Sequence, residues 1–199
     1  GIADYAYAGD LQGNLWRFDL FKATNTTTPA SGNPFASSVI GTAVATDIVA
    51  SYGAKPLFKA ADAAGAVQPI TAPPSLIRHP SQKGYLVIFG TGKYFEDSDG
   101  NVNTTLGHSV YAIWDRKTKA ENTSTSTPPT ITRSNLLEQQ IQQQLTTNIS
   151  GVTNESRTIT QNAPKWYKDN ATADLNDSDV NHWGWRLDLQ IGSTKAGEM

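Results

Sequence analysis

The 199-residue sequence contains no cysteine, and this absence removes three kinds of chemistry together. Disulfide bonds, cysteine-ligated zinc and thiol catalysis all depend on that side chain. An excess of one charge sign is also missing, because 16 basic and 18 acidic residues give a net charge of −2 without a basic block. Nothing therefore favours nucleic acid as a partner. The longest apolar runs are too short to cross a bilayer as helices, so no membrane-spanning segment is expected.

The motifs of common enzyme classes are missing as well. His79, His108 and His182 are far apart in the sequence, and no H-E-x-x-H, G-x-S-x-G or P-loop pattern occurs. The segment GTGKY at residues 90–94 lacks the upstream glycine spacing, and the Ser or Thr after Lys, of a phosphate-binding loop. A tight turn after the apolar strand YLVIFG explains it better. These absences favour a binding protein over an enzyme.

What the sequence does contain is a repeated strand signal, clearest in residues 4–20, DYAYAGDLQGNLWRFDL. Tyr5 and Tyr7 precede a turn that contains Gly13, after which Leu15 and Trp16 begin a second strand. Turn chemistry and strand propensity agree, so the segment predicts a β-hairpin. Any antiparallel β domain could contain such a hairpin.

The same pattern recurs at residues 83–95 (KGYLVIFGTGKYF), 108–115 (HSVYAIWD) and 182–189 (HWGWRLDL). LWRFDL and GWRLDL are nearly the same hexamer, and each copy of the pattern is an aromatic-rich strand. Recurrence of one supersecondary unit predicts stacked blades, although long polar inserts distort a regular period of ~40–45 residues. The aromatic residues predicted to fill the blade interfaces are Trp16, Tyr85, Phe89, Trp114, Trp183 and Trp185.

The order of these segments, with QPITAPPSLIRHP, GYLVIFGTGKYFEDSD and SVYAIWDR between the two hexamers, resembles the C-terminal domain of the PilY/PilC family. Members of this family are type IV pilus tip-associated adhesins and assembly factors. The resemblance implies a mainly β fold: a partial, truncated β-propeller of antiparallel blades with long polar loops, related in shape to quinoprotein propellers. Residues 1–199 would form part of one propeller domain of about three to four blades, incomplete at both ends. Kinship of fold does not imply quinoprotein chemistry.

The resemblance also implies a calcium site at the start of the chain. In the family an acidic loop closes just before the YAGD strand, which makes Asp4 the closing carboxylate and Ile2 a backbone-carbonyl ligand. The remaining ligands would lie upstream of Gly1, so the site is truncated and this chain alone should bind calcium poorly. The residues alone favour a solvent-facing aspartate at a strand start, and only the resemblance brings the calcium interpretation of Asp4 level with it.

Two other acidic segments, DSDGNVN at residues 97–103 and ADLNDSDVN at 173–181, invite a metal interpretation. Neither matches the full EF-hand pattern, which needs glycine at the sixth position and a bidentate glutamate at the twelfth. We expect both to be ordinary solvated loops. The Thr, Ser, Asn and Pro-rich segments 23–38 and 120–130 are predicted to be mobile surface loops.

The function implied by the resemblance is binding rather than catalysis. It is that of a non-enzymatic, calcium-responsive propeller that supports pilus biogenesis and extension, twitching motility and surface attachment. The implied partners are type IV pilins or minor pilins and host or abiotic surfaces. The implied location is extracytoplasmic, at the bacterial cell surface, the pilus tip or the outer membrane, with an export signal expected upstream of Gly1. The alternatives are a generic extracellular adhesion propeller without a pilus link, and a quinoprotein-like enzyme relative.

Residues 133–145, RSNLLEQQIQQQL, give two conflicting signals. Leu137, Ile141 and Leu145 recur at every fourth position, and Glu138 follows Asn135 by three residues, which favours a capped amphipathic helix. The resemblance instead favours a strand that pairs with SRTITQN at residues 156–162. Because tertiary pairing often overrides local propensity, we expect a strand over residues 136–142.

A partial propeller should also be fragile. Propellers bury their sheets by closing radially, so blades without neighbours expose apolar faces and unpaired strand edges. We therefore predict that the chain alone is marginally stable or self-associating.

Overall fold

The structure is a computed structural model that describes residues 5–19, 49–50, 54–100, 107–116, 131–166, 182–191 and 194–195. It is mainly β and mostly antiparallel, as the sequence predicts. The polar segments 23–38 and 120–130, predicted to be mobile loops, lie outside the described residues, and so does the whole acidic segment 173–181. Within the described residues, no helix is long and apolar enough to cross a membrane.

The first sheet has four strands: β1 (Tyr5–Gly9), β2 (Asn14–Asp19), β3 (Val49–Ala50) and β4 (Phe58–Lys59). β1 and β2 form the predicted hairpin, in which Tyr5 is opposite Asp19 and Gly9 is opposite Leu15. β3 and β4 both pair antiparallel with β2. Two short strands therefore follow one another along β2.

The turn between β1 and β2 requires glycine at position 13. Gly13 has a φ of 75°, and a Cβ atom there would lie 2.6 Å from the carbonyl oxygen of Ala60. The carbonyl oxygen of Asp10 accepts a hydrogen bond from the Gly13 N–H at 3.1 Å. The turn thus holds the residues that follow β4 close to the hairpin.

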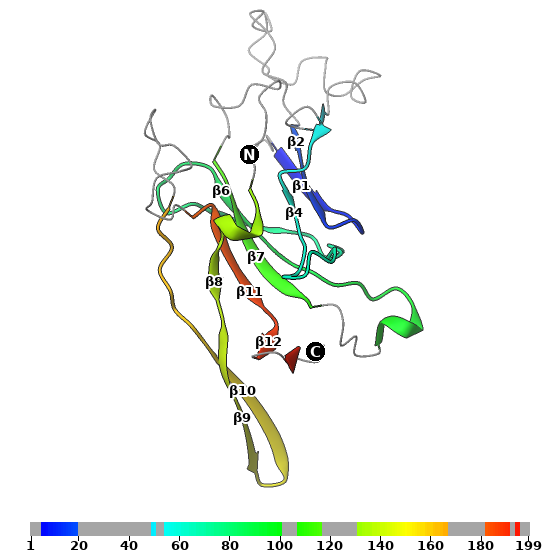
Figure 1. Ribbon diagram of the computed structural model, residues 1–199, viewed down its shortest axis with the longest axis vertical. Coiled ribbons are helices and arrows are strands. Elements are labelled where there is room, and N and C mark those ends of the chain that lie inside the picture. Colours follow the sequence, from blue (N-terminus) through cyan, green and yellow to red (C-terminus); the bar gives the residue numbers. More distant parts are fainter. Residues whose placement is uncertain are drawn as a thin grey trace, which may run out of the picture.

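The second sheet has five strands in the order β5 (Ser75–Arg78), β6 (Tyr85–Gly90), β7 (Ser109–Asp115), β11 (Gly184–Asp188) and β8 (Leu137–Gln139). Each pair is antiparallel except β11 and β8, which are parallel. The strands predicted at residues 83–95, 108–115 and 182–189 are confirmed as β6, β7 and β11. These three copies of the recurring unit are neighbours in one sheet, and the fourth copy forms the first hairpin (Figure 1).

Residues 137–139 and 141–145 form strands, so the expected strand is confirmed, with an interruption at Gln140, and the helical pattern is wrong. The helix-cap signal produces only one 3₁₀ turn, η3 (Arg133–Asn135), before β8 begins. β9 (Ile141–Ile149) then pairs with β10 (Val152–Ile159), which contains most of the SRTITQN segment. Pairing of β8 with β11 and burial of Ile141 outweigh the helix propensity of this segment.

The β9–β10 hairpin extends away from the rest of the molecule (Figure 1). Its two strands are joined by Ser150 and Gly151, both with positive φ, of 54° and 83°. This is the geometry of a two-residue turn that matches the twist of the flanking strands. A last short pair, β12 (Gln190–Ile191) with β13 (Thr194–Lys195), follows β11.

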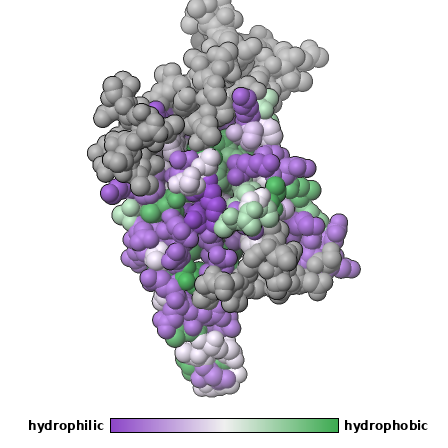
Figure 2. All heavy atoms as spheres, in the orientation of Figure 1, coloured by the Kyte–Doolittle hydropathy of each residue, from purple (hydrophilic) through white to green (hydrophobic). Residues whose placement is uncertain are grey.

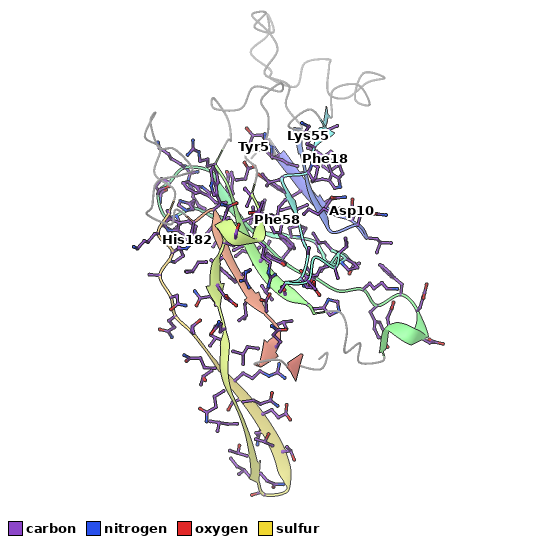
Figure 3. The ribbon with its side chains drawn as sticks, in the orientation of Figure 1. Tyr5, Asp10, Phe18, Lys55, Phe58 and His182 are labelled. Carbon is purple, nitrogen blue, oxygen red and sulfur yellow. The ribbon has the colours of Figure 1, made fainter. Side chains whose placement is uncertain are left out.

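The core lies between the two sheets. Phe58 of β4 contacts Tyr111 of β7 with ring centroids 5.2 Å apart, and Tyr111 stacks on Phe89 of β6 at 5.4 Å. Figure 3 shows Phe58 between the sheets. Of the aromatic residues predicted to fill interfaces, Phe89, Trp114 and Trp183 are buried, whereas Trp16, Tyr85 and Trp185 are half-buried.

Candidate functional site

The predicted calcium ligands Asp4 and Ile2 lie outside the described residues, so the ligand set stays a prediction. The described chain begins at the next residue, Tyr5, which is the first residue of β1. The side chain of Arg17 lies over the Tyr5 ring, 4.9 Å from its centroid. The position predicted to hold the closing carboxylate is therefore directly joined to a strand that contacts a buried arginine.

Asp10, in the turn after β1, is a structural carboxylate. It accepts hydrogen bonds from the backbone N–H groups of Gln12 and Asn14, both at 2.9 Å, and from the Trp16 indole N–H at 2.7 Å. Partial burial raises the pKa of Asp10, but these hydrogen bonds and one from the Asn14 side chain outweigh it, so the net pKa lies below its usual value. Protein donors already occupy this carboxylate.

The acidic segment at residues 97–100 forms a 3₁₀ turn, η1 (Asp97–Gly100). Asp99 accepts hydrogen bonds from the backbone N–H groups of Phe95 and Glu96, at 2.9 and 3.1 Å, and pairs with Lys93 Nζ at 2.9 Å. The Phe95 N–H, followed by Lys93, lowers the pKa of Asp99 from 3.8 to about 2. Asp99 thus fixes its own loop, and no cluster of three or more potential metal ligands occurs among the residues that the structure describes.

A buried ion pair joins the two sheets. Arg17 of β2 and Asp115 of β7 have side chains that are 0% exposed, and Arg17 Nη1 lies 2.8 Å from Asp115 Oδ2 and 3.0 Å from Oδ1. The Tyr7 hydroxyl donates a second hydrogen bond to Asp115 Oδ2 at 2.7 Å. Buried charges are tolerated only when they are paired and hydrogen-bonded in this way. β1 and β2 are therefore fixed to the end of β7.

A second polar network lies at the other end of β7. Asp188, the last residue of β11, pairs with Arg133 and with Arg186 Nη1, the latter at 2.5 Å, and accepts a hydrogen bond from Ser109 Oγ at 2.7 Å. Burial lowers the pKa of Arg133, but the hydrogen bond and charge of Asp188 outweigh it, so the net pKa lies above its usual value. This carboxylate orients two guanidinium groups.

Arg133 and the buried Gln68 connect this network to the first sheet. Arg133 Nη1 donates to the Tyr111 hydroxyl at 3.0 Å and to the Ala61 carbonyl at 3.1 Å, and the Tyr111 hydroxyl lies 2.6 Å from Gln68 Oε1. Burial raises the pKa of Tyr111. The network borders a pocket of about 150 Å³ that is lined in part by Asp62, Gln68, Arg133, Asp188 and Gln190.

An aromatic cluster surrounds His79, which follows β5 directly. The His79 ring is fully buried and stacks on Trp114 with centroids 3.9 Å apart and planes at 11°. Trp166 meets the same ring edge-on at 4.3 Å. His79 Nδ1 accepts the Ser81 N–H at 3.1 Å, and burial lowers the pKa of His79. This histidine is a packed interior side chain rather than an exposed proton carrier.

The sequence did not identify the Arg17–Asp115 pair or the Asp188 network as candidate sites. A signal for both was present in the near-identical hexamers, because LWRFDL contains Arg17 and GWRLDL contains Arg186 and Asp188. In each hexamer the arginine stands between large apolar residues. The hydrophobic pattern therefore does not indicate that the arginine side chain points toward the interior.

Two mostly antiparallel sheets, packed against each other through aromatic residues and a buried ion pair, fit a module of the β-propeller class, in which neighbouring blades cover one another. The family model described as the PilY1 beta-propeller domain matches residues 1–154. The chain belongs to this PilY1 β-propeller family, which confirms the resemblance and the expected fold class.

Curated relatives and a solved structure agree. The chain is 49% identical to the type IV pilus biogenesis factor PilY1 of Pseudomonas aeruginosa strain UCBPP-PA14, covering 100% of this chain and 17% of that protein. It is 44% identical to PilY1 of strain PAO1, covering 100% of this chain and 16% of that protein. The crystal structure of the Pseudomonas aeruginosa PilY1 C-terminal domain aligns with a TM-score of 0.78 at 43% identity, over 99% of this chain and 38% of that domain. The chain thus spans about a sixth of the length of these curated relatives.

Proposed function

We propose that this chain is part of a non-enzymatic propeller domain of a type IV pilus biogenesis factor, located at the cell surface or pilus tip. The observation that carries the proposal is identity of 44–49% over the whole chain to curated factors of that name. The proposed role is support of pilus extension, twitching motility and surface attachment through contacts with pilus subunits and surfaces. Two sheets joined by fully buried side chains suit a rigid binding scaffold.

We further propose that the domain responds to calcium through Ile2 and Asp4. A carboxylate and a backbone carbonyl are hard oxygen donors of the kind that calcium takes, so the chemistry of the donors fits this ion. The ion would supply local charge and a fixed arrangement of its ligands. Asp4, once held, would fix the start of β1, and from there the contacts of Tyr5 with Arg17 and of Tyr7 with Asp115 lead to the second sheet. Through these contacts, ordering of the calcium-binding loop would stabilise the packing between the two sheets.

Calorimetric titration with calcium tests the ligand assignment. The protein should be extended upstream through the acidic loop and compared with its Asp4→Ala variant. An Asp97→Asn variant is the matched control, because Asp97 belongs to an acidic segment that we expect to be merely solvated. Saturable binding that is lost in Asp4→Ala and kept in Asp97→Asn supports the proposal. Binding that is kept in both variants would show that Asp4 is not a calcium ligand and only begins the strand.

The pilus role is tested separately in a strain lacking the full-length gene. We expect complementation with the wild-type gene to restore surface pili and twitching, and complementation with Asp4→Ala to restore fewer pili. Pili sheared from the surface and quantified by immunoblot provide the measurement. Normal piliation in the deletion strain would refute the pilus role and favour a generic adhesion propeller.

A further inference from the structure

The pocket beside the Asp188 network is built from separate segments of the chain. The turn that follows β4, the start of β7, η3 and the end of β11 all line it, and its volume is about 150 Å³. It is partly open to solvent. None of its lining residues belongs to the Arg17–Asp115 pair or is a predicted calcium ligand, so it is a separate candidate site.

Buried polar side chains form one wall of this pocket. Gln68 and Ser109 are 0% and 1% exposed. Gln68 Nε2 donates to Ser109 Oγ at 3.0 Å and to the Gly107 carbonyl oxygen at 2.5 Å, and Ser109 Oγ donates to Asp188 at 2.7 Å. Because these groups already bond to one another, the wall is held in place without a ligand.

Other lining side chains keep hydrogen-bonding capacity. Asp62 Oδ1 accepts the N–H groups of Ala64 and Ala66, both at 2.9 Å, whereas Asp62 Oδ2 has no partner among the described residues. The Nη atoms of Arg133 form the bonds given above, and its Nε–H bonds to no described residue. The side-chain amide of Gln190 is likewise without a partner in the described part of the chain. The pocket therefore offers both acceptors and donors.

The charges around the pocket offset one another. Asp62 and Asp188 are negative, Arg133 is positive, and Arg186 pairs with Asp188 from the same strand. An anionic ligand would meet two carboxylates and a cationic ligand would meet guanidinium groups, and like charges in contact are unfavourable. The pocket is therefore suited to a neutral ligand.

The lining also includes apolar surface. Ala63 and Ala64, on the exposed turn after β4, line the pocket with small apolar side chains. Figure 2 shows that hydrophilic and hydrophobic surface also lie side by side over the visible face of the described molecule. A cavity of about 150 Å³ accommodates one six-membered ring. A neutral ring with hydroxyl groups at its edge and C–H groups on its faces matches this size and this mixed lining.

We propose that the pocket binds one pyranose ring, the terminal sugar of a glycan. Hydroxyl groups both donate and accept, so they can donate to Asp62 Oδ2 and accept from Arg133 and Gln190. Apolar walls with a few placed polar groups are usual in small-molecule sites. The pocket chemistry rests on the described residues alone, whereas use of the sugar in surface attachment rests on the proposed function.

Saturation-transfer difference NMR on the full-length protein tests the ligand class, with a panel of methyl pyranosides as probes. The variant Asp62→Asn/Gln190→Ala keeps the Oδ1 acceptor that the turn needs, replaces Oδ2 with a donor and removes the free amide. Its matched control, Asp97→Asn/Gln143→Ala, makes the same changes at exposed residues outside the pocket. We expect titration of the best-binding pyranoside to show at least about 10-fold weaker binding by the pocket variant and no change in the control.

A second pair of variants tests the position of the site by steric block. Ala64→Phe places a large side chain at the pocket, whereas Ala66→Phe places it on the same turn but outside the lining residues. Binding should be lost in Ala64→Phe and kept in Ala66→Phe. Hydrogen exchange on the wild-type protein saturated with the pyranoside should slow at residues 62–66, a readout that needs no variant to fold.

Two results overturn the inference. If no methyl pyranoside binds the wild-type protein, the ligand class is wrong, and the proposed pilus role is untouched. If both pocket variants bind as their controls do, and exchange at residues 62–66 is unchanged, the sugar binds elsewhere. Failure of the wild-type gene to restore pili would instead refute the proposed function and leave the pocket standing, because the sugar test uses purified protein.

Discussion

Arg17 and Asp115, 98 residues apart in the sequence, form a fully buried ion pair that joins the two sheets. Both lie on strands of the recurring aromatic pattern, and Tyr7 adds a hydrogen bond from the neighbouring strand. Removal of one partner of such a pair leaves an uncompensated charge in a dry interface. The pair is therefore a sensitive point for the stability of the described sheets.

We expect Arg17→Met to lower the free energy of unfolding by about 3–5 kcal/mol, because Asp115 then remains buried without its cation. The double variant Arg17→Met/Asp115→Leu should recover part of this loss, since no charge is left unpaired. Urea denaturation followed by tryptophan fluorescence measures both. Lys93→Met, which breaks the surface pair with Asp99, serves as a control with a small expected effect. A double variant as unstable as the single one would contradict this account.

Stability should also decrease as the pH falls below about 6.5, the usual pKa of histidine. Burial lowers the native-state pKa of His79, and burial together with Lys165 lowers that of His182. The unfolded chain then binds more protons than the native chain at mildly acidic pH, so stability is complete above pH 6.5 and is lost progressively below it.

Denaturant midpoints measured between pH 5 and 8, for the wild type and for His79→Phe, test this dependence. Phenylalanine can stack on Trp114 but cannot be protonated, so the pH slope should flatten, and His182 should account for the remainder. An unchanged slope in the variant would show that His79 does not carry the effect.

The fold was largely predictable, because the strands of the core contain strong local signals. The DLQGN turn requires glycine at position 13, and the segments around Phe89 and Trp114 are long apolar strands. Residues 133–145 show the limit of this reasoning. Their apolar residues recur at every fourth position, which is compatible with a helix as well as with a strand. Only the pairing of Trp185 with Leu137, across a large sequence separation, selects the strand.

The polar sites could not be predicted in the same way. The partner of Arg17 depends on how the two sheets pack, and no local pattern relates it to Asp115. Trp16 is predicted to fill a blade interface, yet it is half-buried and its indole N–H donates a hydrogen bond to Asp10, whereas the adjacent Arg17 is fully buried. The calcium assignment came from the resemblance alone, and Asp4 is not among the described residues.

Gly184→Ala should be strongly destabilising. Gly184 has a φ of 150°, and a Cβ atom there would lie 1.9 Å from the carbonyl oxygen of Ala112 on the adjacent strand β7. Because this neighbour is backbone, β11 must shift away from β7, at a cost of about 3 kcal/mol or more. Gly90→Ala is the matched control, since nothing lies within 4 Å of its added methyl group. Thermal melts of the two variants should separate clearly, and equal melting temperatures would refute the close approach.

Asp188→Asn tests whether one carboxylate orients the second polar network. The substitution keeps the shape of the side chain but removes the charge that faces Arg133 and Arg186, so the two guanidinium groups then repel each other beside a half-buried amide. We expect a loss of about 2 kcal/mol in the free energy of unfolding, less than for a fully buried pair because all three side chains retain some exposure. Glu138→Gln, whose side chain is 43% exposed, should cost less than about 1 kcal/mol, although it also pairs with Arg186. Equal effects of the two variants in urea denaturation would show that Asp188 is only another surface charge.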